Sequence, residues 1–152
     1  MYEFLLSSHS WLRWILLLCF ILVIVKSYTG FKSNRAYSSD DKKWNTILIA
    51  CLHLQAVIGL TLYFISPMMK GILSDFGASM KMSETRFWSM EHLFGMLVAV
   101  VIAQVGSIKS KKQSTDQARF KTAFNYYLIA LIIILLMIPF GIWNADRPLF
   151  RM

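Results

Sequence analysis

Four apolar stretches in the 152-residue chain constrain its fold more than any other feature. They lie at roughly residues 5–26, 45–66, 87–108 and 122–143. Each has about the 20 residues that a helix rising 1.5 Å per residue needs to cross about 30 Å of hydrocarbon. The sequence therefore predicts an all-α integral membrane protein with four transmembrane helices.

The connections between these stretches leave no room for a second domain. They have about 20, 20 and 13 residues, which is too short for independent folding. A β-barrel is excluded because residues 15–25 and 128–138 are unbroken apolar runs rather than segments of alternating polarity. We expect one domain over residues 1–152, folded as an up-down four-helix bundle.

Basic residues are distributed unevenly, and this predicts the orientation. Residues 26–43 and 109–121 each hold five Lys or Arg, whereas the middle connection holds three and the C-terminal tail two. The positive-inside rule places the first and third connections in the cytoplasm, so both termini face the periplasmic side of a bacterial inner membrane. The net charge of +8 then reflects this bias and attraction to anionic lipid headgroups. Nucleic-acid binding is not expected, because no recognition module surrounds the basic residues.

Several short patterns mark the predicted helix ends. Ser38 with Asp41, and Ser114 with Gln117, have capping-box spacing, which predicts that the second and fourth helices begin before the bilayer. Pro139 is expected to kink the fourth helix near its outer end.

Motifs of soluble enzymes are absent from the sequence. It has no P-loop, dinucleotide glycine fingerprint, H-E-x-x-H or G-x-S-x-G, so no catalytic residue is predicted. Cys19 and Cys51 lack C-x-x-C spacing, and we interpret them as buried thiols.

Polar side chains inside the apolar stretches are the candidate site residues. Such groups cost several kcal/mol in hydrocarbon unless they have partners. They are His9, Arg13, His53, Gln55, Glu91, His92 and Gln104. All three histidines of the chain are in this set, although a histidine in a solvated loop would avoid the cost of leaving water. We therefore expect the histidines to meet a ligand or a partner.

Two of the histidines are predicted to lie at one depth. His9 is 17 residues before Lys26, and His92 is 17 residues before Lys109, which places both about 25 Å above the inner boundary. The first and third helices are diagonal in an up-down bundle, so the two rings can face each other. His53 is about 10 Å deeper.

Two facing imidazoles can supply both axial ligands of a b-type haem. This predicts haem b bound by His9 and His92. Small residues follow on one face of the third helix and leave room for a flat macrocycle, or alternatively for close helix packing; they are Gly95, Ala99, Ala103 and Gly106.

The other polar residues keep more than one interpretation. Arg13, one turn after the first histidine, can pair with Glu91 or meet a haem propionate or quinone oxygen. His53 and Gln55 share the second helix. His53 can hydrogen-bond to a residue that ligates the haem, or donate a proton in a quinone pocket. It can also ligate a second haem opposite Met96, or hydrogen-bond within the bundle.

Short strings along the chain carry a family resemblance. They are His9-Ser10-x-Leu12-Arg13-Trp14, His53-Leu54-Gln55, Gly59-Leu60-x-Leu62-Tyr63-Phe64, Glu91-His92 and Ile138-Pro139. Through them, and over nearly its whole length, the sequence resembles small four-helix bacterial membrane proteins labelled cytochrome b-like (the cytochrome B family). The resemblance implies b-type haem, with the three histidines and Arg13 at the family's matching positions. The fourth stretch lacks the histidine of four-histidine, two-haem cytochromes.

The predicted function is that of a cytochrome b-like electron carrier with its haem near the periplasmic face. Its expected partners are the lipid bilayer, a quinone or quinol, and subunits of a respiratory or other membrane complex. An oxidoreductase activity at the haem edge stays open, since electron transfer needs no further catalytic motif.

Two alternatives remain. A copper-handling membrane protein is indicated by methionines near the outer end, since thioethers and imidazoles suit Cu(I); these are Met68, Met69, Met80, Met82 and Met90. The other alternative is an accessory or scaffold subunit of a larger membrane complex, without haem.

Overall fold

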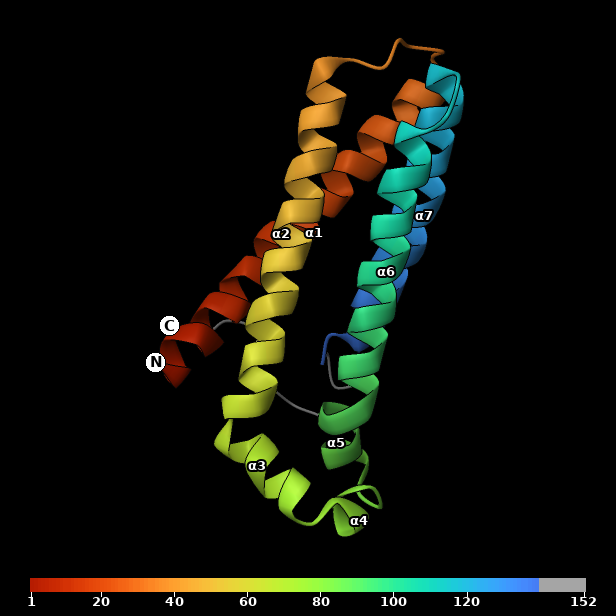
Figure 1. The fold of residues 1–152 in the computed structure, drawn as a ribbon. Helices are drawn as coiled ribbons and strands as arrows, with labels where there is room; N and C mark the ends of the chain where they lie inside the picture. The colour runs from red at the N-terminus through yellow and green to blue at the C-terminus, as the bar shows by residue number, and fades with distance from the viewer. Residues whose placement is uncertain (140–152) are drawn as a thin grey trace.

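The structure is a computed structural model that describes residues 1–139, and every regular element in that part is helical. Four helices are long and apolar enough to cross a membrane, which confirms the all-α, four-span prediction (Figure 1). They are α1 (Tyr2–Lys32), α2 (Ser39–Ile65), α6 (His92–Lys111) and α7 (Asp116–Met137). The third candidate span begins before α6, at Ser83.

The helix starts follow from side-chain caps. The Ser38 hydroxyl accepts from the Asp41 N–H, and the Asp41 carboxylate accepts from the Ser38 N–H, so the predicted capping box is present. The second predicted box is wrong by one residue. Thr115, and not Ser114, is the N-cap of α7, and its hydroxyl accepts from the Ala118 N–H.

The end of α7 differs from the prediction. The helix stops at Met137, and Ile138 has an extended backbone. A residue before proline is driven out of the helical region, so Pro139 ends α7 here and does not kink it. The predicted continuation of this span to residue 143 lies outside the described residues.

The middle segment, predicted only as a connection, folds into short helices. They are α3 (Pro67–Ser74), α4 (Phe76–Ser79), α5 (Ser83–Arg86) and the π-helical turn η1 (Phe87–Glu91), which leads directly into α6. Met69 and Ile72 of α3 are buried, so this helix packs onto the ends of the long helices. We call this side of the molecule the capped end, and the opposite side, with residues 33–38 and 112–115, the basic end (Figure 1).

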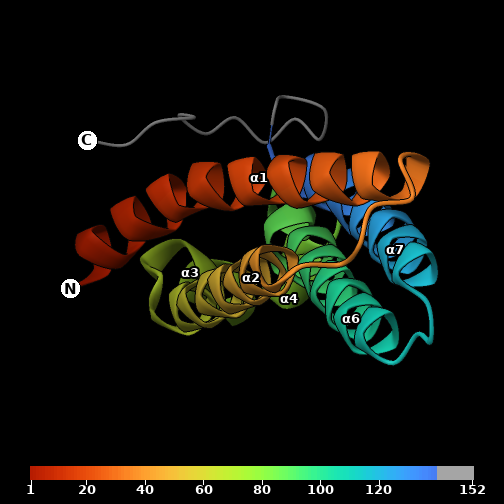
Figure 2. The same ribbon diagram turned by 90° about the horizontal axis from the view of Figure 1, so that it is seen from above.

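The long helices do not pack equally. The α6–α7 contact is the most extensive, α1 packs on both α2 and α7, and α2 packs less closely on α6. From above, α1 crosses the other helices obliquely (Figure 2). Between the capped end and the basic end lies the hydrophobic core, in which Phe20, Leu48 and Tyr127 are fully buried. The Tyr127 hydroxyl donates a hydrogen bond to the Asn45 side-chain oxygen inside this core.

The stripe of small residues on α6 serves the α6–α7 interface. A Cβ at Gly95 would collide with the Met137 side chain, and one at Gly106 with Tyr126. Ala99 and Ala103 are fully buried in the hydrophobic core. The stripe therefore has the helix-packing role that the sequence left as its alternative.

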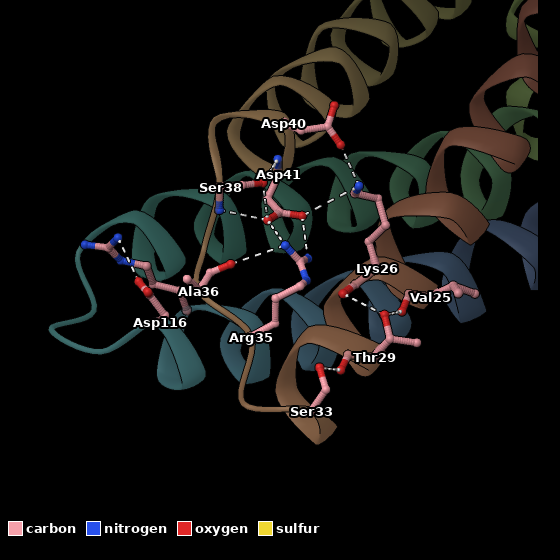
Figure 3. A network of polar contacts seen from close by, with 11 residues as sticks. Val25, Lys26, Thr29, Ser33, Arg35, Ala36, Ser38, Asp40, Asp41 and Asp116 are labelled. Atoms are coloured by element: carbon pink, nitrogen blue, oxygen red, sulfur yellow. Dashed lines mark hydrogen bonds and ion pairs between the residues drawn. The ribbon is translucent and has the colours of Figure 1, made fainter.

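An ion-pair network closes the basic end (Figure 3). Arg35 donates from both terminal nitrogens to Asp41 at 2.8 Å, and Lys26 lies 2.6 Å from the Asp40 carboxylate. The Asp41 side chain is only 3% exposed. The hydrogen bonds to Asp41 raise the pKa of Arg35. This network fixes the loop between α1 and α2 and thereby the crossing of the two helices.

Candidate functional site

A cavity of about 320 Å³ lies at the capped end between α1, α2 and α6, and residues of α3 and α7 also line it. Its volume is within the range of about 300–1,000 Å³ that is typical of small-molecule sites. The walls are mainly apolar. The polar residues among its lining are Tyr2, His9, Ser10, Arg13, Gln55, Tyr63, Ser66, Trp88 and His92. Four of the predicted site residues, His9, Arg13, Gln55 and His92, are thus brought together.

His92 is held in a defined tautomer by the end of α7. Its Nδ1 lies 2.9 Å from the Met137 carbonyl oxygen. A carbonyl can only accept, so Nδ1 carries the hydrogen and Nε2 of the neutral ring keeps its lone pair. Among residues 1–139, Nε2 has no hydrogen-bond partner. Histidines that ligate metals commonly have this arrangement, in which the second nitrogen donates to a carbonyl.

The sequence around Pro139 explains why that carbonyl is available. The last carbonyls of a helix have no intrahelical partner, and Pro139 prevents α7 from continuing. The Met137 carbonyl is therefore left at the helix end, where it accepts the His92 N–H. On the other side, His92 follows η1, and π-helical turns are frequent at functional sites.

His9 enters the cavity region from α1 and lies against Gly59 of α2. A Cβ at position 59 would be 2.9 Å from His9 Cε1, so only glycine lets the ring lie this close. Within the described part of the chain its Nδ1 is buried and has no hydrogen-bond partner. The Gln55 amide donates to the His9 backbone carbonyl at 2.9 Å and so fixes this turn of α1. An unsatisfied buried nitrogen costs about 1–3 kcal/mol, which a ligand would offset.

The two histidines share one cavity. His9 lines it from α1 and His92 lines it from α6. The helices that carry them, α1 and α6, do not pack extensively on each other. A flat group held between the rings therefore would not displace a helix–helix contact.

Arg13 adds a positive charge next to both histidines. Its side chain lines the same cavity as the two histidines, and its guanidinium lies 3.5 Å from Ser10 Oγ and 5.3 Å from the Trp14 ring centre. The alternative pairing with Glu91 is not seen. Glu91 instead pairs with Arg86 at 2.7 Å.

Other predicted positions lie outside the cavity lining, including Glu91 and Gln104. Gly95 and Ala99 are on the α7-facing side of α6, so the prediction that they lie against the macrocycle is corrected. His53 lies on the exposed face of α2, whereas Met96 lines the cavity. A ligand pair of His53 and Met96, and a role for His53 inside the site, are therefore not supported by this placement.

Gly59 and Tyr63 belong to the site but were not predicted as site residues. The Tyr63 hydroxyl donates to the Ser89 carbonyl at 3.2 Å and ties α2 to η1. Gly59 is isolated inside a helical pattern, which can indicate close approach of another group. The sequence therefore contained a signal at Gly59, but it did not show that His9 is the residue that lies against it.

Methionines also reach the cavity. Met68, Met69 and Met96 line it, whereas Met80 and Met82 do not. Among residues 1–139 there is no cluster of three or more His, Cys, Asp or Glu side chains that could hold a metal ion alone. The available donors for a metal are therefore two imidazoles and thioethers.

Comparisons with known proteins find no matching family model, no matching curated protein and no matching solved structure. Functional assignment thus depends on the cavity and on the residues that line it.

Proposed function

We propose that this chain is a membrane haem protein in which His92 and His9 would hold one haem b in the capped-end cavity. The observation that supports this most strongly is the His92 hydrogen bond to the Met137 carbonyl, which leaves Nε2 with a free lone pair in the cavity. The His9 ring, whose buried Nδ1 has no hydrogen-bond partner within residues 1–139, would supply the second nitrogen donor.

The donor set and the walls fit this cofactor. Imidazole nitrogens would hold the iron of a b-type haem, and apolar side chains would pack against its porphyrin. Leu6, Leu52, Leu93 and Val100 provide apolar walls, and Arg13 can meet a propionate. Bound haem would supply one-electron redox chemistry, and the protein would orient it and exclude water.

The proposal includes a cellular setting. We place the basic end in the cytoplasm and the capped end on the periplasmic side of a bacterial inner membrane, with both termini outward in an up-down bundle. The positive-inside rule and the position of the basic loops opposite the cavity support this orientation. The haem would exchange electrons with a quinol or with a respiratory partner.

Absorption spectroscopy of detergent-purified protein, expressed with haem supplied, tests the proposal. We expect a Soret band and reduced b-type bands. His9→Ala and His92→Ala should each abolish the low-spin spectrum, while His53→Ala, outside the cavity, should leave it unchanged. A wild-type protein without haem, or loss of haem only in His53→Ala, would overturn it.

Copper binding is a second candidate because three methionines join the two histidines in the lining. A single ion needs far less space than a cavity of about 320 Å³, which favours the larger cofactor. Stoichiometric copper without a Soret band would favour copper handling. Protein that takes up neither haem nor copper would favour the scaffold alternative.

A further inference from the structure

The outward face of α2 carries a regular stripe of exposed residues. The stripe consists of Ala50, His53, Val57, Leu60 and Phe64. Their spacing alternates between three and four residues, which places them along one side of the helix. Of the four candidate spans, α2 also has the smallest buried share, 17% against 28% or more in the others. Within the described chain no other helix covers this face.

His53 is the polar group on this face that lacks a partner. It lies 10 residues after Lys43, about 15 Å along the helix and so near the middle of a bilayer core of about 30 Å. Two threonines border the stripe, and their hydroxyls bond their own helix: Thr46 to the Lys42 carbonyl at 2.9 Å and Thr61 to the Val57 carbonyl at 2.8 Å. Within residues 1–139, no hydrogen bond satisfies the His53 ring. An imidazole that faces hydrocarbon at this depth is energetically costly unless it has a hydrogen-bond partner.

The same face is continuous with an open side of the cavity. Val57 and Leu60 line the cavity and yet are 62% and 44% exposed. Across from them on α6, Leu97 also lines it and is 43% exposed. This opening lies between α2 and α6, which pack on each other less extensively than α6 packs on α7 or α1 packs on α2. Whatever covers the stripe therefore also covers the side of the cavity.

We propose that the α2 stripe is a dimer interface with a second copy of this chain, in which the two His53 rings hydrogen-bond to each other. Every copy inserts with the same orientation, so a second copy presents its His53 at the same depth. A neutral imidazole has one donor and one acceptor nitrogen and can therefore pair with an identical ring. A two-fold axis along the membrane normal brings the two stripes together.

The residues of the stripe suit this arrangement. Helices associate in a membrane through close packing and hydrogen bonds, since lipid tails remove the hydrophobic driving force. Ala50, one turn from His53, is small enough for a second helix to approach closely. Val57, Leu60 and Phe64 offer apolar contacts to that helix nearer the capped end. The second copy closes the open side of the cavity. The dimer does not depend on which ligand the cavity holds.

Cysteine cross-linking in native membranes tests the interface. In a Cys19→Ala and Cys51→Ala background, Ala50→Cys should give a disulfide-linked dimer on a non-reducing gel. The matched control is Ile129→Cys, which is 50% exposed on α7 and lies at a similar distance from its nearest basic residues. It should stay monomeric. Equal cross-linking at both sites, no cross-linking of Ala50→Cys, or cross-linking to a different protein would overturn the proposal.

Substitution of His53 tests the hydrogen bond separately. His53→Leu removes it while keeping an apolar side chain, so we expect dimerisation in detergent to weaken by about 3-fold to 30-fold. His53→Asn keeps a donor and an acceptor and should retain the dimer. Neither variant changes a residue that lines the cavity, so both should still show a Soret band, and failure of the haem proposal would be seen independently of the dimer. A dimer that His53→Leu leaves unchanged would overturn the role of the ring.

Discussion

Gly59 offers a sensitive test of the position of His9. In the structure a Cβ added at residue 59 would be 2.9 Å from His9 Cε1, whereas ordinary contacts begin at 3.4 Å. In Gly59→Ala the ring must therefore move by about 0.5 Å, which exceeds the tolerance of about 0.2 Å in metal–ligand distances. We expect haem affinity to fall about tenfold or more, which is the size of effect seen when groups that orient ligands are changed.

The same substitution has the opposite effect on the helix itself. Alanine favours a helix interior over glycine by about 1 kcal/mol, so helix stability should rise or stay level while haem binding falls. Haem titration followed by absorption and thermal melting followed by circular dichroism measure the two effects. The control is Gly71→Ala in α3, where a Cβ meets nothing within 4 Å. If Gly59→Ala and Gly71→Ala bind haem equally well, His9 is not a ligand in the position described.

Two further predictions concern packing and the basic end. Gly95→Ala should destabilise the protein by about 1–3 kcal/mol in thermal unfolding, because its Cβ would collide with the Met137 side chain at a closely packed interface. An unchanged melting temperature would contradict the α6–α7 packing. Arg35→Ala should cost about 1–3 kcal/mol because it leaves the buried Asp41 carboxylate without its main partner. Lys32→Ala, an exposed lysine at the end of α1, should be nearly neutral, and equal effects of these two substitutions would argue against a specific role for Arg35.

The four spans could be predicted because the membrane imposes a length and a composition on every helix that crosses it. The capping box at Ser38 is equally local, since it needs only the spacing of two side chains. The short helices between residues 67 and 91 were missed. They are too short to show a helical period, and α3 is stabilised by burying Met69 and Ile72 against other elements.

The candidate site was predicted in part. The depth of His9 and His92 follows from counting residues, and the structure places both rings at one cavity. Counting does not give the direction in which a helix face points. The small-residue stripe on α6 therefore could be read as a haem surface, although it packs on α7. For the same reason the outward position of His53 on α2 was not predicted.

The tautomer of His92 shows a second limit of sequence reasoning. It depends on the Met137 carbonyl, 45 residues away in the chain, being freed by the end of α7. Pro139 indicates that the helix is disturbed. Only the packing of α6 on α7 shows which side chain donates a hydrogen bond to the freed carbonyl.

Titration of haem-free protein in detergent with ferric haem tests the central claim most directly. We predict saturable binding at one haem per chain with a low-spin, bis-histidine spectrum, and loss of that spectrum in His92→Ala. Binding that does not saturate, or a spectrum that is the same in wild type and His92→Ala, would contradict it.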